Sequence, residues 1–245
     1  MQRIQFPPQH GAWAFLIVPL LLTALLGATS WLALVFAVTW ICAYPTSYYG
    51  SRAVFIRIRR GQWSRLAKAA RSAALPWLAV TIVGSAVLIV FRPVLILAGL
   101  VVLALWSVSV WLAWIGRERG ITNDLVLVVI AAVAVPLMWL VGHDTIEPRI
   151  WVAAFACAVF FTGSVLHVKS LIREADDTRW HVASIAYHFL ALIVMSAISP
   201  WFILAFLPAL ARTLFMKPGL RPGAIGGVEA VVSSLFLIAG VLALG

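Results

Sequence analysis

The stretch from His167 to Asp177 concentrates side chains that could do chemistry, in a chain otherwise dominated by Leu, Val, Ala and Trp. It holds three of the eight acidic residues, one of the five histidines and two cations. Four polar residues recur at helical spacing, which predicts one shared face: His167, Ser170, Glu174 and Asp177. The two cations form a neighbouring stripe: Lys169 and Arg173. Ionisable groups near a bundle interior mark a site, whereas at a helix end they are ordinary solvated charge.

Two histidines in the next apolar segment could extend this site. His181 and His188 are two turns apart, and Tyr187 precedes the second. His188 should lie well inside the membrane, where it either contacts a ligand or is a core histidine with satisfied hydrogen bonds.

A third candidate face closes the second apolar segment. Tyr44, Tyr48 and Arg52 are spaced four apart and share a face if the helix persists through Pro45. Two phenols and a guanidinium could bind phosphate or carboxylate, because arginine makes bidentate contacts with such anions. An interfacial aromatic belt followed by an arginine would have the same sequence.

The starts of two further segments carry polar residues. His10 lies just before the small pair Gly11 and Ala12, so it is either a ligand-contacting base or donor or an interfacial histidine. The fifth segment offers three possible N-caps: Thr122, Asn123 and Asp124. Three residues of this region are also candidate binding residues: Arg119, Asn123 and Asp124.

The sequence predicts a loop from Arg52 to Arg71 that carries seven cations, with only Trp63 and a few aliphatic residues among them. At helical spacing these cations form a basic amphipathic surface. Contact with anionic lipid headgroups is the expected role, at about 1 kcal/mol per cation near the surface. Nucleic-acid binding is not expected, because membrane topology already explains the charge.

The composition is that of a helical membrane protein. The mean hydropathy is +1.06 and 11% of residues are charged, against about a quarter in soluble domains. Apolar runs of roughly 17–25 residues alternate with short basic stretches. The 12 Trp and 4 Tyr fit the aromatic enrichment at membrane interfaces.

The sequence predicts one transmembrane domain over residues 1–245. Its nine expected spans are 11–28, 30–49, 73–91, 94–115, 124–142, 150–168, 180–198, 200–216 and 226–244. With the N-terminus in the cytoplasm, alternation leaves only Arg92 and Arg149 of the 18 cations outside. Lys and Arg are retained on the cytoplasmic side. We therefore expect an all-α, multi-pass protein of the bacterial cytoplasmic (inner) membrane, with its C-terminus outside.

The opening Gln-His-Gly-Ala-Trp-Ala-Phe-Leu-Ile-Val-Pro (Gln9–Pro19) and the block Lys169–Glu174 resemble the YwiC-like family of small bacterial membrane proteins. This resemblance covers most of the chain, and His10–Trp13 is its most specific part. It implies a membrane protein and no particular activity.

More distantly, the plan of nine helices with polar blocks after the second and sixth is similar to the UbiA superfamily of intramembrane prenyltransferases. In that family, two aspartate-rich motifs hold Mg²⁺ and a prenyl diphosphate. Here the first motif position, Ala43–Gly50, has no acid, and Ser170 stands where the second motif's leading aspartate is expected. The remaining acids, Glu174, Asp176 and Asp177, cannot assemble a two-metal site. Either the fold binds something else, or cations neutralise the phosphate directly: Arg52, Lys169 and Arg173.

Three hypotheses follow. The favoured one is a cytoplasm-facing pocket that binds or modifies an isoprenoid or other lipid with an anionic head, as a degenerate prenyltransferase. The alternatives are a transporter of a small molecule or anion, suggested by His181 and His188, and a non-catalytic membrane assembly factor. Whether the chain is an enzyme stays open. No cofactor is expected, and Mg²⁺ would be held only by Glu174 and Asp177. Expected partners are membrane lipids and an isoprenoid or anionic small-molecule ligand, with no nucleic acid.

Overall fold

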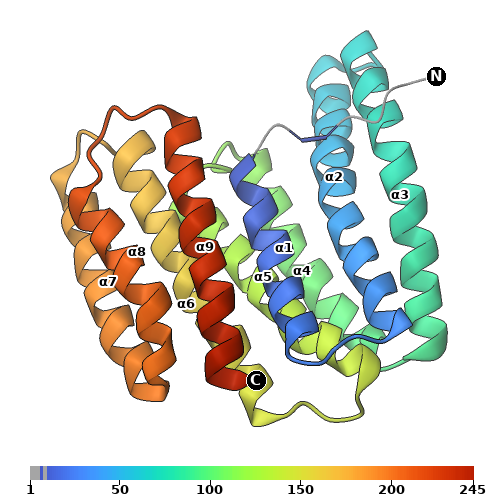
Figure 1. Cartoon of the computed structure of the whole chain (residues 1–245). Helices are drawn as coiled ribbons and strands as arrows, with labels where there is room; N and C mark the ends of the chain where they lie inside the picture. Colours follow the sequence, from blue (N-terminus) through green and yellow to red (C-terminus); the bar gives the residue numbers. More distant parts are fainter. Residues whose placement is uncertain (1–5, 8–9) are drawn as a thin grey trace. The chain divides into compact units, whose positions relative to one another are not determined.

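The computed structural model describes residues 6–7 and 10–245, with side chains for residues 6, 7 and 13 onward. The described residues form nine α-helices joined by short turns (Figure 1). They are α1 (His10–Leu25), α2 (Trp31–Arg60), α3 (Arg65–Phe91), α4 (Leu95–Trp114), α5 (Ile121–Gly142), α6 (Pro148–Val168), α7 (Thr178–Ile198), α8 (Ile203–Phe215) and α9 (Pro222–Leu244). A π-helical turn, η1 (Lys169–Arg173), continues α6, and a 3-10 turn, η2 (Pro200–Phe202), precedes α8.

Seven of these helices are long and apolar enough to cross a membrane by length and composition: α2, α3, α4, α5, α6 with η1, α7 and α9. The prediction of an all-α multi-pass membrane protein is therefore confirmed. The other two predicted spans are shorter apolar helices, Trp13–Leu25 and Pro200–Phe215. Sixteen helical residues rise only about 24 Å, less than a hydrocarbon core of about 30 Å.

The chain divides into two compact units, which we describe separately. Unit 1 is built chiefly from Ala28–Leu127 and Leu137–Asp144, and therefore contains α2, α3 and α4. Unit 2 consists of Gly11–Gly27, Val128–Pro136 and Thr145–Gly245, and contains α6 to α9.

In unit 1 the second helix is longer than predicted. It runs through Pro45 to Arg60, so Arg52–Arg71 is not a loop but two helix ends joined by a four-residue turn. Gly61 ends α2 at a φ of 67°, a left-handed conformation that suits glycine. Ser64 then caps α3, because its side chain accepts from the backbone N–H of Ala67.

The α2–α3 pair packs closely around one glycine. A Cβ placed on Gly84 would lie 1.9 Å from Thr39 Oγ1, so α3 approaches α2 there without a side chain between them. Thr39 Oγ1 donates to the Val35 carbonyl at 2.7 Å, which fixes the threonine rotamer. One turn or two further along, the Thr46 and Thr81 hydroxyls are 3.3 Å apart and hydrogen-bond across the pair.

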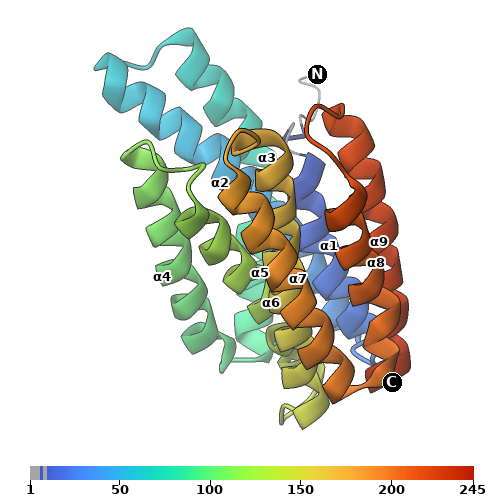
Figure 2. The ribbon, with the colours of Figure 1, turned by 90° about the vertical axis from the view of Figure 1, so that its left-hand side faces the viewer.

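In unit 2, α6, α7, α8 and α9 form a closed bundle, since each contacts the next and α9 contacts α6. The turned view in Figure 2 shows α6 and α7 side by side, and α8 beside α9. The centre is aromatic: Phe160 stacks on Phe236 at 4.4 Å between ring centroids, and Phe206 meets both rings edge-on.

Replacing Gly84 with alanine should destabilise the α2–α3 pair, because the new methyl group forces Thr39 out of its bonded rotamer. We expect a loss of about 1–3 kcal/mol, typical of overpacking, measured by thermal unfolding in detergent. Gly99→Ala on α4 is the matched control, since no atom lies within 4 Å of its added Cβ. Adding Thr39→Ala to Gly84→Ala should recover most of the loss. Equal stability of the two glycine variants would contradict the close approach.

Candidate functional site

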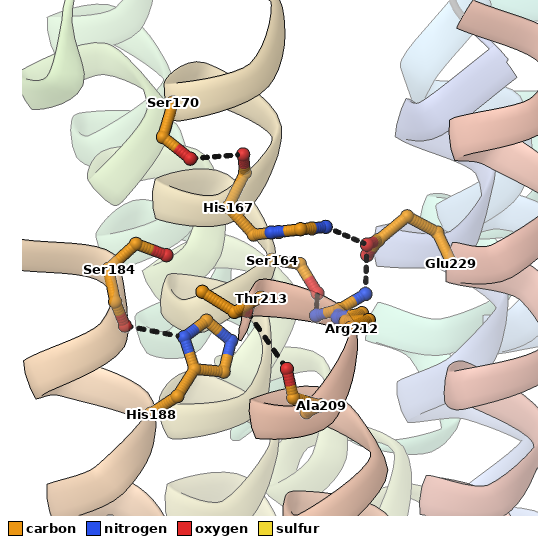
Figure 3. A network of polar contacts seen from close by, with 9 residues as sticks. All are labelled: Ser164, His167, Ser170, Ser184, His188, Ala209, Arg212, Thr213 and Glu229. Atoms are coloured by element: carbon orange, nitrogen blue, oxygen red, sulfur yellow. Dashed lines mark hydrogen bonds and ion pairs between the residues drawn. The ribbon is translucent and has the colours of Figure 1, made fainter. Parts of the chain in front are cut away.

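A buried polar network joins four helices of unit 2 (Figure 3). We use this name for five residues: Ser164 and His167 on α6, His188 on α7, Arg212 on α8 and Glu229 on α9. At its centre the Glu229 carboxylate pairs with the Arg212 guanidinium. The same carboxylate oxygen lies 3.9 Å from His167 Nε2, so one acid faces two basic side chains.

The helices position these groups by spacing and by one cross-link. Ser164 and His167 are three apart on α6 and share a face. Arg212 Nη2 donates to Ser164 Oγ at 3.1 Å, which ties α8 to α6. Because the guanidinium also holds Glu229, Arg212 links α6, α8 and α9 at one level of the bundle.

Burial makes this pairing obligatory. The side chains of His167 and Arg212 are 0% and 3% exposed, and that of Glu229 is 17% exposed. Arginine stays charged in proteins, and an unpaired buried charge costs several kcal/mol. Glu229 is therefore the counterion of Arg212, and it is also the network's most accessible member.

His188 continues the network toward the middle of α7. Its Nδ1 lies 2.7 Å from the Ser184 carbonyl oxygen, and its ring centroid is 6.3 Å from that of His167. A carbonyl only accepts, so Nδ1 carries a proton and Nε2 of the neutral ring is an acceptor. The ring packs on bare backbone, because a Cβ on Gly163 would lie 2.9 Å from His188 Nε2.

Within the described part of the chain, two buried histidine nitrogens of the network, His167 Nδ1 and His188 Nε2, have no hydrogen-bond partner, and neither has Ser184 Oγ next to the network. Buried polar atoms are normally paired. These atoms therefore give the network the capacity to bind a further polar group. By contrast, no group of three or more His, Cys, Asp or Glu side chains suited to a metal ion occurs among the described residues.

The stretch His167–Asp177 does not form the single helical face that its spacing predicts. The helix changes to a π-turn at Lys169 and ends at Arg173. His167, Lys169 and Ser170 are buried, whereas Glu174 is only half-buried. Ser170 Oγ donates to the His167 carbonyl at 2.8 Å, and Lys169 Nζ lies 5.9 Å over the Trp180 ring.

The acidic end of this stretch serves the next helix. Asp177 caps α7, accepting from the backbone N–H of Arg179 at 3.0 Å and from its side chain at 3.1 Å. These hydrogen bonds hold the pKa of the Asp177 carboxyl below its usual value. Arg173 and Asp176 are exposed, and His181 is half-buried.

The remaining candidates belong to unit 1. The side chain of one of them, His10, lies outside the described residues. The predicted face on α2 forms: Arg52 Nη1 donates to Tyr48 OH at 3.4 Å, and the Tyr44 and Tyr48 rings are 6.5 Å apart. Arg119 is exposed, and Asp124 is half-buried in the first turn of α5.

The predicted cap of α5 is wrong. Gly120 is the N-cap, and the three candidate residues all lie inside the helix. Asn123 instead ties α4 to α5, accepting from Ser109 Oγ at 2.7 Å and donating to the Glu118 carbonyl at 2.8 Å. Its amide group is thus committed to structure.

Sequence reasoning missed two central residues of the network. The sequence analysis counted Arg212 only among the cytoplasmic cations, and it did not name Glu229 as a candidate residue. The available signal was position: Glu229 is the only acidic residue after Asp177 and lies within an apolar helix. An intramembrane carboxylate marks a candidate site and calls for a partner cation.

The fold and this network define a polytopic helical membrane protein with an ion pair inside one helix bundle. Residues 6–139 match the model of the YwiC-like protein family, and the chain belongs to that family. It is 28% identical over 236 residues to "Uncharacterized protein YwiC" of Bacillus subtilis (strain 168), covering 95% of each chain. It is 25% identical over 234 residues to "Uncharacterized protein" of Haemophilus influenzae (strain ATCC 51907 / DSM 11121 / KW20 / Rd), covering 94% of each. No solved structure matches. The YwiC-like resemblance is thus confirmed, and the UbiA-like one stays a prediction.

Replacing Glu229 with glutamine should strongly destabilise the protein, because the Arg212 charge would remain buried without its counterion. We expect a loss of about 3–5 kcal/mol, as for other broken buried pairs, measured by thermal unfolding in detergent at neutral pH. The double variant Arg212→Gln/Glu229→Gln removes both charges and should recover most of it. Glu118→Gln, at an exposed site, is the matched control. A Glu229→Gln variant as stable as that control would contradict the pairing.

Proposed function

We propose that the protein carries a small anion across the membrane together with a proton, using the buried polar network of unit 2. The single observation that carries this proposal is the sharing of the Glu229 carboxylate by Arg212 and His167 in a buried setting. Ionisable groups of this kind inside membrane proteins mark substrate pathways and proton relays.

The coupling follows from charge balance. At rest, the negative Glu229 neutralises the positive Arg212. An anion that enters alone would place two negative charges around one guanidinium. For unit charges about 4 Å apart, that repulsion is about 4 kcal/mol at an effective dielectric constant of about 20. A proton on Glu229 removes this repulsion by neutralising the carboxylate, and a proton on His167 offsets it by giving the carboxylate a second cation. In either case the guanidinium is available to the anion, so the anion and the proton bind together.

The order of exposure along the network suits a transport path. Glu229 is partly exposed, His167 is fully buried beside it, and His188 follows toward the middle of α7. His188 is the eleventh residue of α7, about 15 Å along the helix axis from its start. Its unpaired Nε2 is the next atom able to accept a proton or a polar substrate group.

The distribution of cations supports placing the Glu229 end of the network on the cytoplasmic side of a bacterial inner membrane. In unit 2, this end follows α6 and α8 and carries Lys169, Arg173, Arg179, Lys217 and Arg221. The opposite end of unit 2, one helix length away at the start of α6, carries a single described cation, Arg149. Lys and Arg are enriched on the cytoplasmic side.

The hypothesis of a lipid ligand with an anionic head stays a prediction. The Arg212 guanidinium suits the anionic head of such a lipid. The prenyltransferase form of the hypothesis, however, relied on the acidic residues that follow α6. Of these, Asp177 is engaged as a helix cap and Asp176 is exposed. The pairing of Arg212 with Glu229 lends that form no support, so transport is the function that the geometry favours.

Proton-coupled uptake is testable in proteoliposomes loaded with a pH-sensitive dye and clamped with valinomycin. We expect external phosphate, sulfate or succinate to acidify the lumen of wild-type vesicles. In Glu229→Gln the Arg212 charge is permanently free, so exchange of the radiolabelled anion should persist while acidification is lost. Arg212→Gln should lose both, because it removes the anion's counterion.

The comparison is made at equal amounts of folded protein, with Glu118→Gln as the control that retains both activities. Two results would count against the proposal. One is acidification by Glu229→Gln at the wild-type rate, and the other is a wild type that moves no protons with any of the three anions.

A further inference from the structure

The α2–α3 hairpin of unit 1 is too long to end at the membrane surface. Helix α2 has 30 residues and α3 has 27, lengths of about 45 Å and 40 Å, against a hydrocarbon core of about 30 Å. The extra helical length lies at the end where the turn joins α2 to α3, because α2 becomes polar only in its last ten residues. This end therefore stands in the headgroup region or beyond it.

The same end of the hairpin is strongly cationic. Six exposed cations surround the turn: Arg52, Arg59, Arg60, Arg65, Lys68 and Arg71. Arg57 is half-buried among them. No carboxylate of the hairpin offsets this charge, since the first acidic residue in the sequence is Glu118. The surface is therefore complementary to a dense array of negative charge.

An apolar groove of about 360 Å³ opens beside these cations, between the end of α2 and the end of α4. Its walls include Phe55 and Ile58 from α2 and three tryptophans from α4, Trp106, Trp111 and Trp114. Two contacts hold the walls in place. Trp106 Nε1 donates to Ser47 Oγ at 2.5 Å, and the Phe55 and Trp114 rings meet edge-on at 5.3 Å.

Helical spacing puts the charge next to the groove. Arg52 and Arg59 lie three residues before and four residues after Phe55, so all three occupy one stripe of α2. Across the groove, the exposed Arg117 follows the end of α4. An apolar channel thus has guanidinium groups at its membrane-surface end, the arrangement that matches an amphiphile with an anionic head.

We propose that this groove binds one anionic phospholipid, with its phosphate on Arg52 and Arg59 and part of an acyl chain between α2 and α4. A free phosphate has nothing to place among the tryptophans. A zwitterionic lipid carries no net negative charge to attract the arginines at the end of the groove. The site lies wholly in unit 1 and is independent of the buried polar network.

The test uses the full-length protein in vesicles and compares brominated phosphatidylglycerol with brominated phosphatidylcholine as quenchers of tryptophan fluorescence. Bromine quenches at contact, so quenching of the groove tryptophans reports occupancy. We expect wild-type protein to prefer the anionic lipid at least about fivefold, since two or more cations near the surface favour it. Arg52→Gln/Arg59→Gln should reduce this preference to less than about twofold.

The matched control is Arg65→Gln/Lys68→Gln, which removes the same charge from the start of α3 and should keep most of the preference. Val110→Phe, which fills the groove without adding a tryptophan, should lower quenching by the anionic lipid while leaving the basic end intact. If the two double variants lost the preference for the anionic lipid equally, the proposed site would be wrong, and the preference would come from the overall surface charge of the hairpin end. Equal quenching by both lipids in the wild type, or displacement of the lipid by inorganic phosphate at constant ionic strength, would also overturn it.

Discussion

A guanidinium that cannot lose its charge lies inside an apolar bundle, and the arrangement of unit 2 at that level follows from it. Arg212 is 3% exposed, so its charge requires a counterion and hydrogen-bond acceptors from neighbouring helices. Glu229 on α9 and Ser164 on α6 supply them. Because both partners come from other helices, the pair fixes the register of three helices at once. The aromatic centre fills space but does not select a register in this way.

The same requirement explains why the irregular backbone lies where it does. In hydrocarbon every backbone polar group must be satisfied internally, so departures from α-helix are tolerated where protein surrounds them. The π-turn η1 follows His167 directly, and its first residues, Lys169 and Ser170, are buried. Inserting one residue per turn rotates the following side chains relative to an α-helix. Lys169 and Ser170 at the start of the turn are buried next to His167, whereas the acidic residues lie beyond the turn, where Asp177 caps α7.

Hydropathy alone predicted the nine helical segments, because burial of backbone polar groups in lipid leaves few alternatives to helix. It could not predict helix ends governed by single residues, such as Gly61, or the use of Gly120 as a cap. It also could not pair Arg212 with Glu229. The two residues are 17 positions apart on different helices, so no periodicity within one helix relates their side chains. His167 was found because it lies in a local polar cluster; Glu229 was missed because it stands alone in an apolar helix.

The two units accommodate charge in opposite ways. Unit 1 presents its cations on an exposed hairpin end, where solvent and headgroups screen them. Unit 2 buries the Arg212–Glu229 ion pair, with His167 Nε2 3.9 Å from the Glu229 carboxylate. When acid and base share a low-dielectric site this closely, an added proton belongs to the pair and not to one residue. Its arrival weakens the hold of Glu229 on Arg212 whichever atom takes it. In the proposed transport, the anion and the proton would therefore bind at the same ion pair, and an external anion would replace the Glu229 carboxylate on Arg212 only when a proton binds as well.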